Sequence, residues 1–148
     1  TVVAILARNN NSPQIAFQLL IYPTTAPEPE TPSHFKFAEG YLLTRKTITW
    51  FYKHYLRSAA DTKDFRYAPL ITDDLSRMPS SLIITAGYDP LRDEAVDYAK
   101  KLIESGNDVK LTNYSGMAHG FILMGGAVDV ARKAIAESAF EIKNALKI

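Results

Sequence analysis

The sequence contains no cysteine among its 148 residues, which excludes disulfide frameworks, thiolate zinc sites and catalytic cysteines. It also lacks any apolar run near the ~20 residues that a membrane-spanning helix needs. No stretch resembles a cleavable signal, so we expect a cytoplasmic protein without a membrane span. An excess of charge is missing too, because 17 Lys and Arg balance 16 Asp and Glu to a net charge of +1. This balance gives no electrostatic footprint for nucleic acid.

Signals for bound cofactors are equally scarce. The seven glycines are dispersed apart from Gly125 and Gly126, so there is no glycine-rich phosphate-binding loop. The three histidines show no metal-ligand spacing of the H-E-x-x-H kind. We therefore expect neither a metal nor a cofactor. With 47% hydrophobic and 22% charged residues, the composition is that of an ordinary globular domain.

What the sequence does contain is an alternation of apolar strands and amphipathic helices. Residues 15–22 are almost continuously apolar, which is typical of a strand buried on both faces of a parallel sheet. The alternation implies right-handed crossovers, and it predicts an α/β protein with a doubly wound parallel sheet. The expected elements are helix 1–9, strand 15–22, an aromatic-rich helix 44–56, strand 81–86, helix 90–104, strand 109–113 and helix 128–146.

The last two helices carry apolar stripes at helical spacing. The stripe of the first consists of Leu91, Ala95, Tyr98 and Leu102, and that of the second of Val128, Ala131, Ile135, Ala139, Ile142 and Leu146. Three strands are few for a doubly wound sheet, and the first has no partner upstream. The sequence therefore predicts an incomplete domain.

Two polar residues follow consecutive strands. Asp89 comes after the second strand and His119 after the third. Functional residues of open parallel sheets lie beyond the carboxyl ends of the strands. An acid followed by a histidine is the chain order of α/β-hydrolases, in which the nucleophilic serine comes first.

Each of these residues has a structural alternative. Asp89 could serve only as a helix N-cap, and His119, which is followed by glycine, could serve only as a turn residue. Their joint placement after consecutive strands favours the catalytic interpretation. His34, in a proline-rich loop, and His54, in the aromatic helix, are weaker candidates for which a surface or packing role is expected.

Several segments, in this order, carry a resemblance to a known family. They are Phe37-Ala38-Glu39-Gly40-Tyr41-Leu42-Leu43-Thr44, Trp50-Phe51 to Tyr55-Leu56, Ala68-Pro69-Leu70, Leu82 to Glu94, and Gly116-Met117-Ala118-His119-Gly120-Phe121. Over essentially all 148 residues the chain resembles the C-terminal half of the hormone-sensitive-lipase-like esterases, the α/β-hydrolase branch with HGG and GDSAG motifs. The resemblance implies that residues 1–148 are the C-terminal part of a single α/β-hydrolase domain. Asp89 then corresponds to the catalytic acid and His119 to the catalytic base, with Asp93 or Glu94 as fallback acids.

The sequence departs from this family by lacking HGG, GDSAG and any Gly-x-Ser-x-Gly. The resemblance implies that the serine lies a few residues before Thr1. It also implies that the oxyanion-hole glycines lie further upstream. We therefore expect the N-terminal half of the same protein as a partner, within one polypeptide or as a separate chain.

The function implied by the resemblance is hydrolysis of small carboxylic esters with short or medium acyl groups through a Ser-His-Asp triad. We expect the substrate pocket to be lined by Phe37, Tyr41, Leu42, Trp50 and Phe121. Two alternatives remain open: a non-catalytic ligand-binding relative, as in plant hormone receptors of this architecture, and a serine hydrolase of the prolyl-peptidase kind.

The strand at residues 108–114 would be the last of the family's sheet. Its outer edge would carry unpaired backbone groups, protected by little more than Lys110. We therefore expect a homodimer through this strand.

Overall fold

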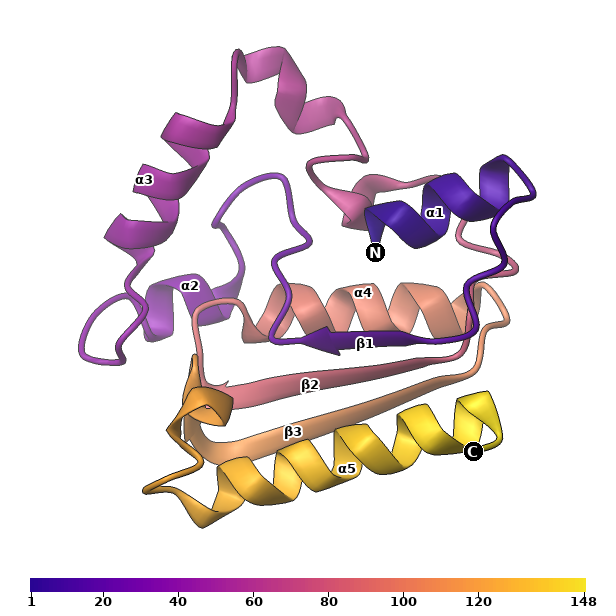
Figure 1. The fold of residues 1–148 in the computed structure, drawn as a ribbon. Coiled ribbons are helices and arrows are strands. Elements are labelled where there is room, and N and C mark those ends of the chain that lie inside the picture. Colours follow the sequence, from indigo (N-terminus) through magenta and orange to yellow (C-terminus); the bar gives the residue numbers. More distant parts are fainter.

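The computed structural model describes residues 1–148 and contains three parallel strands in the order β1–β2–β3 (Figure 1). The predicted α/β class with a parallel sheet is confirmed. None of the helices combines the length and the apolar character that crossing a bilayer requires. The elements are α1 (Val2–Asn9), β1 (Gln18–Ile21), α2 (Pro32–Lys36), α3 (Arg45–Tyr55), β2 (Ser81–Tyr88), α4 (Arg92–Glu104), β3 (Val109–Ala118) and α5 (Asp129–Leu146), with short 3-10 turns η1 (Ala59–Lys63), η2 (Pro69–Ile71) and η3 (Phe121–Met124).

The central strand β2 is buried along seven of its eight residues because helices cover both of its faces. Successive side chains of a strand point to opposite faces. Ile83 accordingly belongs to one core with residues of α1 and α4, such as Ile5 and Tyr98. Its neighbours Leu82 and Ile84 belong to a second core, on the side of α5. Figure 1 shows α5 along one side of the sheet and α1 and α4 on the other.

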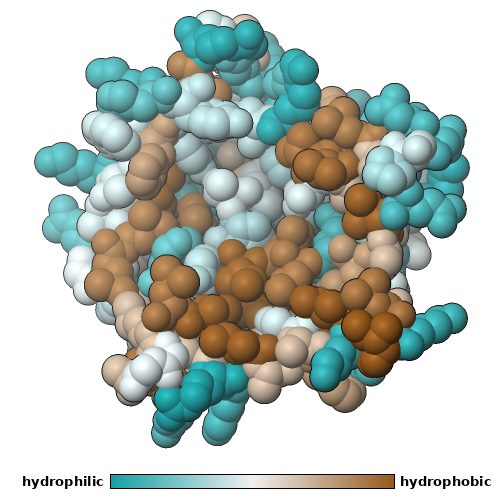
Figure 2. Space-filling view, viewed as in Figure 1, coloured by the Kyte–Doolittle hydropathy of each residue, from teal (hydrophilic) through white to brown (hydrophobic).

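Strand β1 differs from its prediction in length and burial. Only Gln18–Ile21 form the strand, and three of these four residues are half-buried rather than buried. The reason is that β1 pairs with β2 alone, so its other edge has no neighbour. Figure 2 shows apolar surface gathered across the strip that β1 occupies in Figure 1.

The aromatic helix α3 begins as predicted, because the hydroxyl of Thr44 accepts a hydrogen bond from the N–H of Thr47 at 3.1 Å. Ile48 is the buried residue of α3, whereas Trp50, Phe51 and Tyr55 are exposed. Tyr52 is half-buried, with its hydroxyl 2.8 Å from that of Thr24 and its ring centroid 5.5 Å from that of Tyr67.

The last two helices differ in how well their apolar stripes predict burial. All four predicted stripe residues of the first are buried: Leu91, just before α4, and Ala95, Tyr98 and Leu102 within it. In α5 the buried residues are Ala131, Ala134 and Ser138, whereas the predicted Ile135 is 49% exposed and Leu146 also lies at the surface. Small side chains let α5 approach the sheet closely, and larger ones are turned away. The stripe prediction for α5 is therefore correct for Ala131 and wrong for Ile135, Ala139 and Leu146, which are exposed. Val128 and Ile142 are half-buried.

Candidate active site

The carboxyl ends of all three strands lie on the same side of the molecule, at the left of Figure 1. Along most of the β2–β3 ladder the partners differ by 28 residues, as in Ser81 opposite Val109 and Ala86 opposite Tyr114. The register then shifts, and Tyr88 lies opposite Ala118, a difference of 30 residues. With the earlier register, Asp89 would face residue 117. The two-residue shift instead aligns Asp89 with His119.

The shift depends on a close backbone approach at Gly87. A Cβ atom at this position would lie 1.9 Å from the carbonyl oxygen of Ser115. A side chain at residue 87 is therefore incompatible with this path of β3. The same path makes β3 five residues longer than the predicted strand 109–113, so that it ends immediately before His119.

Asp89 is buried, and each of its carboxylate oxygens has a different partner. Oδ1 accepts a hydrogen bond from the N–H of Leu91 at 2.9 Å. Oδ2 lies 2.8 Å from Nδ1 of His119. The N-cap of α4 is Leu91, so Asp89 is not the helix cap that the alternative required; one of its oxygens holds the turn before α4 and the other faces the histidine.

His119 stands on a turn that places its imidazole beside Asp89. Gly120 has φ = +82°, in the left-handed region that glycine adopts without strain, and η3 begins directly after it. The imidazole is 25% exposed, and no hydrogen bond within the chain engages its Nε2. Nδ1 is thus held from inside the protein while Nε2 is free for an external partner.

Tyr22, which the sequence did not single out, completes the surroundings of the imidazole. It follows β1 directly, and its ring centroid lies 4.4 Å from that of His119, with the two planes inclined by 55°. Burial, and to a smaller extent the negative charge of Asp89, raises the pKa of the Tyr22 phenol. No local pattern identifies this residue, because Tyr22 and His119 are separated by 97 positions.

The five residues predicted to line a substrate pocket do not form one cluster. Phe37 is buried and makes edge-on contacts with Tyr41 at 5.3 Å and with Tyr88, the residue before Asp89, at 5.7 Å. Phe121 is buried, and its ring centroid lies 6.2 Å from that of Tyr22. Leu42 is 68% exposed, and Trp50 stacks on His54 of its own helix. Their role in substrate binding stays a prediction.

A second buried cluster lies just beyond Asp89 along the chain. Glu94 and His34 are both fully buried, and Oε2 of Glu94 lies 3.2 Å from Nε2 of His34. Oε1 of Glu94 accepts hydrogen bonds from the backbone N–H groups of Thr25 and Ala26. His34 therefore has a packing role rather than a surface role. Glu94 lies in the first turn of α4, and its carboxylate also binds the backbone of residues 25 and 26.

Ser33 and Asp93 extend this cluster toward the site. The Ser33 hydroxyl donates to the carbonyl of Pro90 at 2.6 Å and accepts from the N–H of Asp93 at 3.1 Å. A carboxylate oxygen of Asp93 in turn accepts from the N–H of Ser33 at 2.8 Å. These bonds fasten the proline-rich loop to the start of α4. His119 contacts Asp89, not the fallback acids Asp93 or Glu94.

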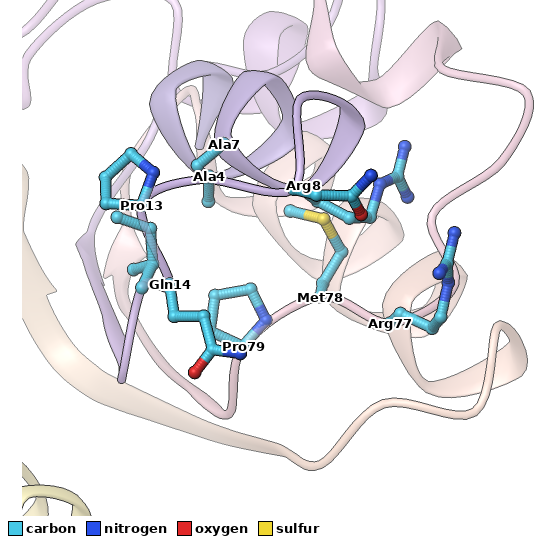
Figure 3. A pocket seen from close by; sticks show the side chains of 10 residues that line it. Ala4, Ala7, Arg8, Pro13, Gln14, Arg77, Met78 and Pro79 are labelled. Atoms are coloured by element: carbon cyan, nitrogen blue, oxygen red, sulfur yellow. The ribbon is translucent and has the colours of Figure 1, made fainter.

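The structure contains no group of three histidine or acidic side chains that could hold a metal ion. A cavity of about 350 Å³, lined in part by Arg8, Arg77 and Met78, opens before the first residues of β1 and β2 (Figure 3). It lies at the opposite end of the sheet from Asp89. The guanidinium of Arg8 is already bonded there to the carbonyls of Asp74 and Ser76.

A larger hollow of about 580 Å³ lies between α1, the end of β1 and α3. Its apolar lining includes Leu20, Pro23 and Phe51, and Pro23 is the residue after Tyr22. This hollow is the one that borders the carboxyl end of β1. It is therefore the better placed of the two for a molecule that approaches the imidazole.

Comparison with known proteins points to one fold. A family model described as alpha/beta hydrolase fold matches residues 1–123. The carboxylic ester hydrolase LipN of Mycobacterium tuberculosis is 42% identical over 117 residues, which are 78% of this chain and 31% of that protein. The carboxylesterase NlhH of the same organism is 36% identical over 149 residues, covering 98% of this chain and 46% of that protein.

Solved structures agree with these relatives. A thermostable esterase from Pseudomonas putida superposes with a TM-score of 0.95 and 34% identity, covering 99% of this chain and 47% of that one. A hyperthermophilic esterase from Pyrobaculum calidifontis gives a TM-score of 0.92 and 33% identity, covering 97% of this chain and 48% of that one. The chain thus spans half or less of the length of the proteins it matches.

Proposed function

The chain belongs to the family with the alpha/beta hydrolase fold, and on that premise we propose that it is the C-terminal part of a carboxylic ester hydrolase. The observation that carries this proposal is the 2.8 Å contact between Asp89 Oδ2 and His119 Nδ1 at the carboxyl ends of the strands. The ester hydrolases among its relatives support the reaction class.

In the proposed mechanism a serine from the part of the protein before Thr1 attacks the ester carbonyl. His119 Nε2 accepts the serine proton as the new C–O bond forms, and the imidazolium then gives this proton to the departing alcohol. Water then attacks the acyl carbonyl and gives its proton to His119 Nε2, and the imidazolium returns this proton to the serine oxygen as the acid departs. Asp89 keeps Nδ1 protonated and stabilises the imidazolium, because its buried carboxylate has few other ways to satisfy its charge.

The substrates we propose are esters with short or medium acyl groups. Phe37, Tyr41, Leu42, Trp50 and Phe121 are the proposed lining, completed by the part of the protein before Thr1. The edge-on contacts of Phe37 with Tyr41 and Tyr88 support an aromatic wall near Asp89. The guanidinium of Arg92 lies over the Phe37 ring, 5.2 Å from its centroid.

The test uses the complete protein that carries this chain, with p-nitrophenyl esters from acetate to dodecanoate. We expect hydrolysis of the shorter esters, labelling of one serine by a fluorophosphonate, and loss of both in His119→Ala. His54→Ala, which removes an exposed imidazole on α3, is the matched control and keeps full activity. Binding of esters without turnover would instead identify a ligand-binding relative. Cleavage of prolyl peptides in preference to esters would identify the prolyl-peptidase kind.

We further propose that the protein forms a homodimer through the outer edge of β3. This strand pairs with β2 alone, and Leu111 is exposed on it. Lys110 cannot protect the edge as a free charge, because its ammonium is paired with Glu137 and Glu141 of α5. Sedimentation velocity at micromolar concentration should show a dimer that Thr112→Lys dissociates. A wild-type monomer would refute this interface.

A further inference from the structure

Tyr22 lies in an unusual backbone conformation at the carboxyl end of β1. Its φ is +36°, in the left-handed region that residues other than glycine seldom adopt. Its N–H still donates to the carbonyl of Ile84 at 2.7 Å, so the ladder continues one residue past β1. Strained residues of this kind cluster at functional sites because the surrounding structure must hold them in place.

The strained residue carries the ring that contacts the imidazole. The Tyr22 and His119 rings are 4.4 Å apart between centroids, and Phe121 contacts Tyr22 from another side at 6.2 Å. The titratable groups in contact with the imidazole are therefore Asp89, from the loop after β2, and Tyr22, from the end of β1. Asp89 bonds one ring nitrogen, whereas Tyr22 packs against the ring.

A cation within about 6 Å of an aromatic centroid is attracted by the negative face of the ring. The imidazole becomes such a cation each time it accepts a proton. Burial, together with the nearby Asp89, raises the pKa of the Tyr22 phenol, so this side chain stays neutral at the pH values at which esters are hydrolysed. Its ring therefore adds no second negative charge beside Asp89.

From this geometry we propose that Tyr22 is a positioning residue that orients the His119 imidazole and stabilises its protonated form. The inference deepens the proposed ester hydrolase, since it concerns the base of that same reaction. Both effects require the aromatic ring of Tyr22, and neither requires its hydroxyl.

The experiment compares Tyr22→Leu and Tyr22→Phe in the complete protein. The first readout is the ¹H–¹³C NMR titration of the His119 imidazole, assigned by its loss in His119→Gln. Tyr22→Leu should move the titration midpoint to lower pH by about half a unit, because the imidazolium loses the ring that stabilises it. Tyr22→Phe should leave the midpoint within error of the wild type.

The second readout is the pH dependence of kcat/KM. We expect its acid limb to move in the same direction in Tyr22→Leu, with kcat reduced about tenfold and KM changed less. Tyr22→Phe should stay within about twofold of the wild type. Tyr114→Leu is the matched control: it removes a ring of the same apolar core that contacts Phe121 but not the imidazole. It should lower stability without moving the midpoint.

The proposal is overturned if Tyr22→Leu leaves the NMR midpoint unchanged, or if Tyr22→Phe or Tyr114→Leu moves it equally far. Should Tyr22→Leu fail to fold, Tyr22→Met fills the space without an aromatic ring and carries the same expectations. Because the NMR titration needs no ester, it separates this inference from the reaction itself. A shifted midpoint in a protein without esterase activity would support the contact and refute the hydrolase.

Discussion

Two carboxylate–histidine pairs, with acids five residues apart around the start of α4, differ in their hydrogen bonding and in their exposure. Asp89 and Glu94 are both buried, and each lies close to a ring nitrogen of a histidine. The partner of Asp89, His119, is 25% exposed, whereas the partner of Glu94, His34, is sealed from solvent. Asp89 and His119 are also hydrogen-bonded at 2.8 Å, whereas Glu94 Oε2 and His34 Nε2, 3.2 Å apart, form no hydrogen bond.

The difference in exposure separates chemistry from architecture. An imidazole must reach a molecule from outside to transfer a proton, and His119 Nε2 is free to do so. Every partner of the Glu94 pair belongs to the protein, including the backbone N–H groups of Thr25 and Ala26 and the hydroxyl of Thr31, which lies 2.7 Å from His34 Nδ1. The sealed pair therefore fastens the proline-rich loop, and the open pair is the candidate for catalysis.

The largest expected effect comes from Asp89→Asn in the complete protein. The new amide oxygen can still accept from the N–H of Leu91, so the fold should persist. Its NH₂ group, however, would donate to Nδ1 of His119 and hold the wrong tautomer. We expect kcat to fall by up to about 10⁴-fold, as this change does in serine proteases. Steady-state kinetics beside a urea melt measures both quantities, and a loss of activity no greater than that of Asp93→Asn would contradict the assignment.

Glu94→Gln should show the opposite pattern. The amide oxygen can still accept from the N–H groups of Thr25 and Ala26, but these buried donors lose a charged acceptor and His34 loses the negative charge beside it. We expect a loss of about 2–3 kcal/mol in the free energy of unfolding, with kcat of the folded protein within about tenfold of the wild type. Urea denaturation measures the stability. A collapse of kcat at unchanged stability would place Glu94 in the chemistry and end the contrast between the pairs.

Asp93→Asn makes the same Asp-to-Asn change at a position four residues after Asp89. Asp93 accepts from the N–H of Ser33 and lies in the first turn of α4, where a negative charge favours the helix. The expected cost is about 1 kcal/mol of stability, with activity essentially unchanged. Its melt and its kinetics, read beside those of Asp89→Asn, test whether distance from His119 decides the outcome.

Glu137 lies on α5 and is bonded to Lys110, Thr112 and Tyr114 of β3. Burial acts to raise its pKa, but hydrogen bonds from Lys110, Tyr114 and Thr112 outweigh this, so its pKa is lowered. A carboxyl whose pKa is lower when folded contributes stability above its unfolded pKa, and loses it as the pH falls through its folded pKa.

Glu137→Gln should therefore destabilise by less than about 1 kcal/mol at pH 7. The difference from the wild type should shrink as the pH falls below the ordinary glutamate pKa of about 4.5. Urea midpoints at several pH values measure this effect. A difference in stability that grows toward acid pH would contradict a lowered pKa of Glu137 in the folded protein.

The sequence by itself determined the class of the fold and the two residues worth testing. Apolar runs and the Pro and Gly residues between them mark strands and helices locally, and parallel strands must carry their carboxyl ends to one edge. Asp89 and His119 follow two such strands, so their closeness could be predicted. The helix at Arg92–Glu104 was predicted with its buried face for the same reason, since its stripe lies within one element.

Only the tertiary structure decided how the two residues meet. The two-residue register shift between Ala86 and Tyr88 aligns His119 with Asp89, and it depends on the approach of Ser115 to Gly87. Tyr22 beside His119, and His34 beside Glu94, likewise join segments 97 and 60 positions apart. Periodicity reports which face of an element is apolar. Register and the sealing of a charge are set by which distant segments pack together, and no single segment contains that information.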